Sequence, residues 1–321
     1  MSKQPLIDQL DQAITDILAN PSVMPSGVDA SLIDLLQLAR DLRQLPRPNF
    51  KVELKSQLER EISMSTETVQ YRAGFRSVTP YIVVRGAAEL LTFVRQVFGA
   101  EETFRGETGP GSIHAEVRIG DSMMMIGGSP DYPGPIRPGT VRVFVDDPDA
   151  VYQRALNAGA VPTLEMTENF GERFGCVDDR FGNSWIISTH RGELYLPEYD
   201  HTITPFLYAE GADRFIDFLK QAFGAEEILR ADSPEGTVKH AMIKIGDSAI
   251  ATGEIREGQS RLPSMLYLYV PDADAVYDRA IRAGAKSIYP PADQPYGDRN
   301  GGVTDPWGNQ WYMATPLPRS K

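Results

Sequence analysis

The sequence DPWGNQW at Asp305–Trp311 is a close copy of the sequence DRFGNSW at Asp179–Trp185. Asp, Gly and Asn reverse a chain most easily, because they tolerate backbone angles that other residues avoid. The Trp that closes each copy is large and apolar, and it favours burial. Each copy is therefore predicted to be a turn that leads into a core strand, and the pair indicates that the chain builds the same structure twice.

The repeat extends well beyond this turn. Phe93–Glu102 returns as Phe218–Glu227 with seven of ten residues identical, and Asp149–Ala160 returns as Asp274–Ala285 with nine of twelve identical. Because these matches occur in the same order along the chain, they predict an internal duplication.

Each copy has the pattern of two β-α-β-β-β units in series. In the first copy, a strand at Tyr81–Val84 is followed by a helix that stops at Gly99 and by strand-like runs that end at Ile126. After a loop rich in Gly and Pro, the order begins again with a strand at Val141–Val145 and a helix at Pro148–Ala158. Asp146 or Asp147 is expected to cap that helix. The second copy has the same order of strands and helices.

The predicted fold class is therefore α+β, with two tandem domains behind a small helical region. Residues 1–63 show helical spacing of leucines and isoleucines, and residues 64–77 have the polar composition of a linker. The two domains are expected at 78–189 and 203–316, joined by a linker at 190–202. The helical region is interpreted either as helices packed on the following domain or as a partner-binding or regulatory module.

Composition excludes several classes of function. The 321 residues carry a formal net charge of −12, which disfavours nucleic acid and gives no attraction to an anionic membrane surface. Cys176 is the only cysteine, so neither an intramolecular disulfide nor a cysteine metal cage can form. No apolar run approaches the roughly 20 residues that a spanning helix needs. A cytoplasmic protein without nucleic-acid or membrane partners is expected.

The repeated motifs resemble those of the vicinal oxygen chelate (VOC) superfamily, which contains glyoxalases, bleomycin-resistance proteins and dioxygenases, and most of all its PhnB-like subgroup. The motifs are Thr-Pro-Tyr/Phe at the opening strand, Phe-Gly-Ala-Glu-Glu at the helix end, His114-Ala115-Glu116 before Ile119-Gly120-Asp121, and the Asp179 and Asp305 turns. The resemblance implies paired units whose strands curve around a cavity for a small organic molecule. It also implies that the two domains pack as an internal pseudo-dimer, and a higher oligomer is possible.

Metal enzymes of this superfamily hold a divalent ion with His and Glu residues on particular strands. The opening strands here read Thr79–Ile82 and Thr204–Leu207, and the closing strands read Trp185–Ile187 and Trp311–Met313. None of these segments contains His or Glu, so no metal and no cofactor are predicted. The alternative is a divalent metal ion held by unusual ligands such as His114, His240 and Glu116.

His114 and His240 occupy matching places and are the catalytic candidates, although either can equally be a structural residue on a polar strand face. Arg173 and Arg299 also match; each either binds an anionic ligand or pairs with the nearby turn acid, Asp179 or Asp305. Trp185 and Trp311 either line a pocket or lie in the core. The full set of candidate ligand-binding residues is Tyr81, His114, Arg173, Trp185, Phe206, His240, Arg299 and Trp311.

The leading hypothesis is a small-molecule-binding protein related to glyoxalases and bleomycin-resistance proteins, without the usual metal site. One alternative is a metal-dependent lyase or dioxygenase, and whether the chain is an enzyme stays open. Another is a metabolite-sensing regulatory protein that uses its N-terminal helices.

Overall fold

The computed structural model describes residues 74–318 apart from 110, 170, 190, 192–195, 197 and 256–261. The helical region predicted at 1–63, most of the linker at 64–77 and His190 lie outside the described residues. The helices and strands that follow all belong to the unit Val69–Lys321.

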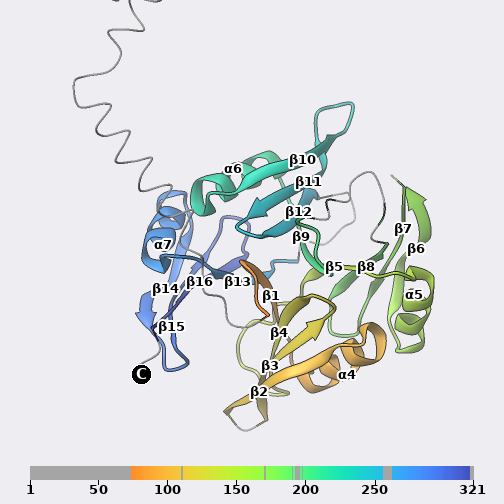
Figure 1. Cartoon of the computed structure of the whole chain (residues 1–321), viewed down its shortest axis with the longest axis horizontal. Coiled ribbons are helices and arrows are strands. Elements are labelled where there is room, and N and C mark those ends of the chain that lie inside the picture. The colour runs from red at the N-terminus through yellow and green to blue at the C-terminus, as the bar shows by residue number, and fades with distance from the viewer. Residues whose placement is uncertain are drawn as a thin grey trace, which may run out of the picture. The chain divides into compact units, whose positions relative to one another are not determined.

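Strands and helices follow one another in the predicted order four times (Figure 1). The first repeat contains β1 (Val78–Val83), α4 (Ala87–Phe98), β2 (Glu101–Gly109), β3 (Ser112–Ile119), β4 (Ser122–Gly128), β5 (Thr140–Phe144), α5 (Pro148–Asn157), β6 (Val161–Asn169), β7 (Glu172–Asp178) and β8 (Ser184–Ser188). The second contains β9 (Ile203–Ala209), α6 (Ala212–Phe223), β10 (Glu226–Asp232), β11 (Val238–Ile245), β12 (Ser248–Glu254), β13 (Met265–Tyr269), α7 (Ala273–Arg282), β14 (Lys286–Asp293), β15 (Asp298–Thr304) and β16 (Gln310–Pro316). The α+β class with repeated β-α-β-β-β units is confirmed.

The predicted helix ends are also confirmed. Gly99 adopts the left-handed conformation, with φ of 69°, and its N–H bonds back to the last turn of α4. At the start of α5, the Asp147 side chain accepts a hydrogen bond from the Ala150 N–H, so Asp147 is the cap rather than Asp146. Asp272 caps α7 in the same way.

The strands form two eight-stranded sheets, and each sheet joins half of one repeat to half of the other. The first sheet has the order β14-β15-β16-β13-β1-β4-β3-β2, and the second has the order β10-β11-β12-β9-β5-β8-β7-β6. The junctions are the antiparallel pairs β1–β13 and β5–β9. Each four-stranded unit thus pairs the open edge of its first strand with the first strand of a unit from the other repeat.

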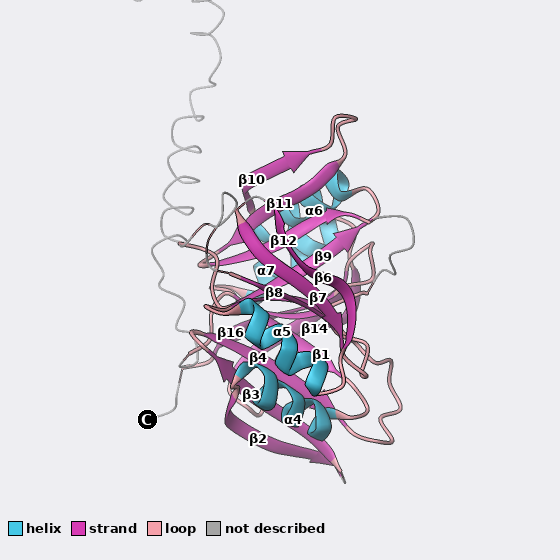
Figure 2. Ribbon diagram, turned by 90° about the vertical axis from the view of Figure 1, so that its right-hand side faces the viewer, coloured by secondary structure: helices cyan, strands magenta, loops and turns pink. Residues whose placement is uncertain are grey.

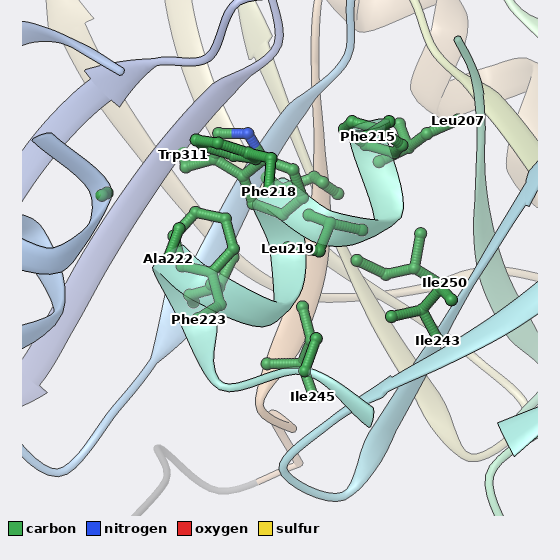
Figure 3. Packing of buried hydrophobic residues seen from close by; sticks show 14 of the residues in the cluster. Leu207, Phe215, Phe218, Leu219, Ala222, Phe223, Ile243, Ile245, Ile250 and Trp311 are labelled. Atoms are coloured by element: carbon green, nitrogen blue, oxygen red, sulfur yellow. The ribbon is translucent and has the colours of Figure 1, made fainter. Parts of the chain in front are cut away.

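The apolar cores beneath the helices, in contrast, form within the repeats. The α4–α5 core is drawn almost wholly from the first repeat, and the α6–α7 core almost wholly from the second. In the second core, Trp311 packs against Phe223 with ring centroids 4.6 Å apart (Figure 3). Trp185 packs equivalently against Phe98 at 4.9 Å. Cores within repeats and sheets across repeats together join the two halves of the chain.

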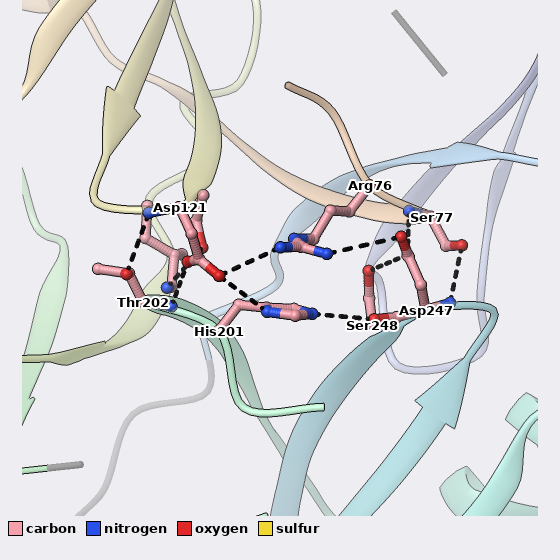
Figure 4. A network of polar contacts seen from close by, with 9 residues as sticks. Arg76, Ser77, Asp121, His201, Thr202, Asp247 and Ser248 are labelled. Atoms are coloured by element: carbon pink, nitrogen blue, oxygen red, sulfur yellow. Dashed lines mark hydrogen bonds and ion pairs between the residues drawn. The ribbon is translucent and has the colours of Figure 1, made fainter. Parts of the chain in front are cut away.

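A polar network near the two junctions ties the repeats together (Figure 4). The Thr202 N–H donates to Asp121 Oδ1 at 2.8 Å, and the Ser77 N–H donates to Asp247 Oδ1 at 2.8 Å. Arg76 and His201 both contact Asp121 Oδ2, at 3.1 and 3.0 Å. Each turn acid therefore holds the chain segment that enters the other repeat's first strand.

Side chains on the side of each sheet away from the helices form two further clusters. We name these sides the first and the second strand face, after the sheets. The first strand face carries Phe75, Tyr81, Met123, Met125, Tyr267, Tyr269, Tyr312 and Ala314. The second carries Phe174, Cys176, Ile186, Phe206, Tyr208, Met242, Ala249 and Ala251, together with neighbouring apolar residues. Figure 2 shows the helices lying against the sheets. Because each sheet joins the two repeats, each strand face contains residues of both repeats.

None of the described helices is both long and apolar enough to cross a membrane.

Candidate functional site

On the first strand face, the structure brings the predicted residues Tyr81 and His114 together. Tyr81 Oη lies 2.8 Å from His114 Nδ1, and their rings meet edge to face with centroids 5.3 Å apart. Tyr81 reaches His114 across β4 at Gly127, which lies opposite His114 in the strand register. A Cβ on Gly127 would lie 2.7 Å from Tyr81 Oη, so the absence of a side chain there makes room for the contact.

His114 also faces a buried acid. Its Nε2 atom lies 3.6 Å from Glu116 Oε1, and the Glu116 side chain is only 4% exposed. Burial raises the pKa of Tyr81, so its phenol stays protonated near pH 7 while it is hydrogen-bonded to the imidazole. The partly exposed imidazole thus lies between the Tyr81 phenol, to which it is hydrogen-bonded, and the buried Glu116 carboxyl group.

Tyrosines from several strands surround these three residues. Tyr267 donates to Asp298 at 2.9 Å, Tyr289 bonds Asn300, and Tyr312 donates to Gln310 at 3.2 Å. Burial also raises the pKa of Tyr267, and Asp298 adds to the effect. Tyr289 and Tyr312 are half-buried, whereas the Tyr296 ring beside them is 59% exposed. The face thus presents aromatic rings whose orientations are held by hydrogen bonds.

The second strand face repeats this arrangement with different chemistry. Phe206 stands in the place of Tyr81, His240 in that of His114, and Met242 in that of Glu116. The rings of Phe206 and His240 lie 5.7 Å apart. Burial, and then the positive charge of Arg142, lowers the pKa of His240 to about 4, so this imidazole is neutral near pH 7.

A buried ion pair lies on the same face. Arg142 Nη2 donates to Glu172 Oε2 at 2.6 Å, and the Ser188 hydroxyl donates to the same oxygen at 3.1 Å. Burial raises the pKa of Glu172, although Arg142 and Ser188 act in the opposite direction. The equivalent place on the first strand face holds the neutral donor Tyr267 and Asp298. The two faces therefore differ in charge at their centres.

Other predicted residues lie away from the strand faces. Trp185 and Trp311 have no exposed surface, and both belong to the helix-side cores. Their indole N–H groups donate to Asp179 and Asp305, at 2.9 and 2.8 Å. This agrees with the interpretation of both indoles as core residues. Neither indole has exposed surface with which it could line a pocket.

The predicted partners of the two arginines are wrong. Arg173 forms a two-pronged pair with Asp149, and Arg299 pairs with Asp274 and Asp293. Asp149 and Asp274 lie in the first turns of α5 and α7, so the arginines connect β7 and β15 to helix starts. Asp179 and Asp305 are instead occupied by their own turns, which the sequence spacing did not reveal.

Sequence reasoning missed the central residues of both faces, in particular Arg142, Glu172, Tyr267 and Asp298. A charged residue within the otherwise apolar strand Thr140–Phe144 was the signal that could have identified Arg142. Its partner, Glu172 on β7, could not be found in the same way. In the sheet, β8 lies between β5 and β7, and in the sequence a whole helix lies between these two strands.

The donor atoms on the central strands do not fit a divalent metal ion. Strands β1, β4, β13 and β16 present phenols and thioethers to the first strand face, and β5, β8, β9 and β12 present mainly apolar side chains and Arg142 to the second. Hard or borderline ions prefer carboxylate and imidazole ligands. Among the described residues, no three His, Cys, Asp or Glu side chains are grouped closely enough to hold a metal ion.

Two cavities lie elsewhere. A hollow of about 240 Å³ lies between α4, the end of α5 and the Arg180–Phe181 turn. A cavity of about 10 Å³, the size of one water molecule, lies at the junction of the repeats beside Arg76 and His201. Neither includes His114 or His240.

Comparison with known proteins agrees with the fold. Residues 199–313 match the model of the Glyoxalase/Bleomycin resistance protein/Dioxygenase superfamily. An uncharacterised protein of Mycobacterium tuberculosis is 32% identical over an alignment of 158 residues that covers 46% of this chain and 87% of that protein. An uncharacterised protein of Mycobacterium bovis is 34% identical over 126 residues, covering 36% of this chain and 83% of its own.

Among solved structures, glyoxalase I from Zea mays superposes with a TM-score of 0.59 at 14% sequence identity, covering 74% of this chain and 92% of that one. The repeated β-α-β-β-β units thus define a glyoxalase-like fold. The chain belongs to the Glyoxalase/Bleomycin resistance protein/Dioxygenase superfamily.

Proposed function

We propose that the first strand face binds a small, flat organic molecule through aromatic contacts and hydrogen bonds, without a metal ion or another cofactor. The observation that carries this proposal is the hydrogen-bonded pair of Tyr81 and His114 beside partly exposed tyrosine rings. The proposal places the chain with the PhnB-like proteins of its superfamily, as a tandem duplication whose small-molecule site is shared by the two repeats.

The tyrosine rings suit a flat ligand because their orientations are set before binding. The hydroxyl groups of Tyr267, Tyr289 and Tyr312 each bond a neighbouring side chain. Rings held in this way lose little conformational freedom when a ligand packs on them, which favours affinity.

The polar end of the ligand belongs at His114. Its side chain is 22% exposed, whereas Glu116 behind it is almost fully buried. The imidazole can therefore meet a ligand while Tyr81 and Glu116 hold its ring in place. A ligand carbonyl or hydroxyl at this position completes the recognition.

Metal-dependent lyase or dioxygenase chemistry is not part of the proposal, since the donor set does not fit a divalent ion. Equilibrium dialysis against zinc, manganese and iron tests this directly. We expect no stoichiometric, tightly held ion, and one ion retained per chain would contradict the metal-free proposal.

Ligand binding is tested by calorimetry with a panel of uncharged aromatic carbonyl compounds. We expect members that bind the wild type to bind Tyr81→Phe about tenfold more weakly, since one hydrogen bond to the oriented imidazole is lost. Tyr277→Phe is the matched control, because Tyr277 lies on α7 and bonds only the exposed Ser287 hydroxyl. If the panel binds both variants equally, the ligand does not lie at the first strand face.

A further inference from the structure

The hollow between α4, the end of α5 and the Arg180–Phe181 turn lies on the helix side of the first repeat, and we name it the α4 hollow. Its volume is about 240 Å³, and it shares no residue with either strand face. Side chains of α4 form one wall, and Ala158, Gly159 and the turn form the other. Ligand pockets commonly hold about 300–1,000 Å³. The α4 hollow therefore suits a small molecule of one or two rings.

The second repeat shows what covers the equivalent place there. The repeat aligns Phe93 with Phe218 and Phe181 with Trp307. The Trp307 ring packs against Phe218 with centroids 5.9 Å apart, and its indole N–H donates to the Glu210 carbonyl at 2.9 Å. An indole ring that belongs to the chain thus covers Phe218, and a backbone acceptor holds its N–H.

The first repeat lacks this cover. Phe181 is smaller than Trp307, and it lies against Gly86, where an added Cβ would be 2.5 Å from Phe181 Cε1. Phe93 lines the α4 hollow, together with Phe181. A free molecule with a ring the size of indole can therefore take in the first repeat the place that Trp307 takes in the second. It gains affinity by removing the apolar surface of these rings from water.

The wall formed by α4 presents hydrogen-bond acceptors to the hollow. The Thr92 hydroxyl donates its proton to the Ala88 carbonyl at 3.2 Å, so its lone pairs remain for a ligand. Glu89, like every carboxylate, accepts only. Its Oε2 atom lies near the edge of Phe181, since the two border the position of a Gly86 Cβ at 3.4 and 2.5 Å. A ring that carries an N–H meets these acceptors.

The charges around the hollow favour a neutral ligand. Glu89 lies on one wall, and the Arg180 guanidinium lies on the other, 4.9 Å from the centre of the Phe181 ring. A ligand carboxylate would be repelled by Glu89, and a ligand ammonium group would be repelled by Arg180. A neutral ring meets neither repulsion.

We propose that the α4 hollow binds a small, neutral aromatic molecule with a ring N–H, of the indole class. The inference is independent of the proposed function, because the hollow and the first strand face have no residue in common.

Titration of the full-length, ¹⁵N-labelled chain with indole, followed through its amide signals in NMR spectra, tests the proposal. We expect saturable shifts at Thr92, Gly159 and Phe181, which all line the hollow. N-methylindole should bind at least about threefold more weakly, because it lacks the N–H. The proposal is overturned if indole causes no saturable shift at these three signals, or if N-methylindole binds equally well.

Gln96→Trp and Arg95→Trp form a matched pair of variants. Both residues are exposed on α4, but only Gln96 lines the hollow. The bulky side chain of Gln96→Trp should block the hollow and weaken indole binding at least about tenfold, whereas Arg95→Trp should bind indole like the wild type. Equal affinity of the two variants would place indole outside the hollow and refute the assignment.

Phe181→Trp tests the comparison of the two repeats. It gives the first repeat the ring that Trp307 supplies in the second, so indole binding should weaken about tenfold or more while the midpoint of urea unfolding stays unchanged or rises. Undiminished binding in a folded Phe181→Trp protein would contradict the proposal. Tyr81→Phe should bind indole like the wild type, so a failure of the first strand face is detected separately.

Discussion

The indole N–H of Trp311 donates a hydrogen bond of 2.8 Å to the Asp305 carboxylate, within the turn that begins the last strand. The same carboxyl group accepts bonds from the Trp307 N–H, the Asn309 N–H and the Asn309 amide. Burial raises the pKa of Asp305, although these four donors act in the opposite direction. The turn is therefore built around one acid that needs both Asn and Trp, which explains why the two copies share these residues.

Replacing Trp311 is expected to destabilise the fold strongly. Trp311→Ala should lower the free energy of unfolding by about 3–5 kcal/mol, since a fully buried indole is removed from the core. Trp311→Phe should cost about 1–3 kcal/mol, because it leaves a buried carboxyl group short of one donor. Urea unfolding followed by circular dichroism measures both.

Trp307→Phe serves as the control for these variants. Trp307 is half-buried, and its indole donates to the Glu210 carbonyl, so a smaller loss is expected. A loss below about 1 kcal/mol in Trp311→Ala would contradict a core role for Trp311.

The network between the repeats is expected to stabilise the junctions. Burial acts to raise the pKa of Asp121, but bonds from the Thr202 N–H, the Ser122 and Thr202 hydroxyls and the charge of His201 outweigh it and hold this pKa well below its usual range. Asp121→Ala should cost about 1–3 kcal/mol of unfolding free energy, because the Thr202 N–H and Arg76 lose their acceptor. This stability is present above the usual Asp pKa of about 3.8 and is lost as the pH falls below it.

Asp247→Ala removes the equivalent acid of the second repeat and should act in the same direction. Asp131→Ala is the control, since Asp131 is exposed and lies outside the network. Urea midpoints of the three variants at pH 7 decide the point: if Asp121→Ala and Asp131→Ala behave alike, the network does not stabilise the chain.

His240 is expected to make stability depend on pH. Its pKa is about 4 in the folded chain, against an ordinary value of 6.5, so the unfolded chain binds the proton more tightly. The contribution of the neutral imidazole is fully present above about pH 6.5 and is lost as the pH falls through about 4. The unfolding free energy of the wild type should therefore fall relative to that of His240→Phe from pH 7 to pH 4. A constant difference would show that the imidazole does not titrate in this window.

Asp200 is expected to act with the opposite sign. Burial raises its pKa to about 6 from 3.8, although the Leu196 N–H and Arg142 oppose the shift. The protonated carboxyl group contributes stability below about pH 3.8, and this contribution is lost as the pH rises through about 6. Asp200→Asn should thus gain stability relative to the wild type between pH 4 and pH 7. A relative loss over the same range would mean that Asp200 stays ionised when folded.

Gly127→Ala tests the geometry of the first strand face. The added Cβ would lie 2.7 Å from Tyr81 Oη, which is too close for contact, so Tyr81 has to move away from His114. We expect the imidazole ring signals of His114 in NMR spectra to shift because the ring loses its hydrogen bond with Tyr81, as they should in Tyr81→Phe. Gly139→Ala is a control for the loss of a glycine as such, because the nearest atoms lie 3.9 Å from a Cβ there, which is ordinary contact, and Gly139 is not in the left-handed conformation. An unchanged His114 signal in Gly127→Ala would contradict the Tyr81–His114 bond.

The order of elements could be predicted from the sequence because its signals are local. Gly99 and Asp147 mark helix ends through the conformation and the hydrogen bonds of their own neighbours, and alternation marks the strands. Tyr81 and His114 were identified as candidates because they match Phe206 and His240 in the repeat. The hydrogen bond between Tyr81 and His114 forms because β4 lies between their strands and has Gly127 at the point of contact. Both features depend on residues that are distant in sequence.

Arg142 and Glu172 show where sequence reasoning stops. They lie far apart in the chain, and the strand between theirs in the sheet follows both in sequence. The alignment of the repeats does not help, because the equivalent pair is Tyr267 and Asp298, which has a different charge. Arg173 was paired with the wrong acid for a similar reason, since nearness in sequence to Asp179 outweighed the approach of α5 in space.

The sequence by itself determined that a β-α-β-β-β unit occurs four times and that each repeated turn leads into a core strand, because turns, caps and apolar periodicity act over a few residues. Only the tertiary structure decided that the sheets join halves of different repeats, and hence which side chains share a strand face. The physical reason is that an open strand edge can pair with any compatible edge. The choice between them rests on packing over the whole unit, including the hydrogen bonds of Asp121 and Asp247 at the junctions.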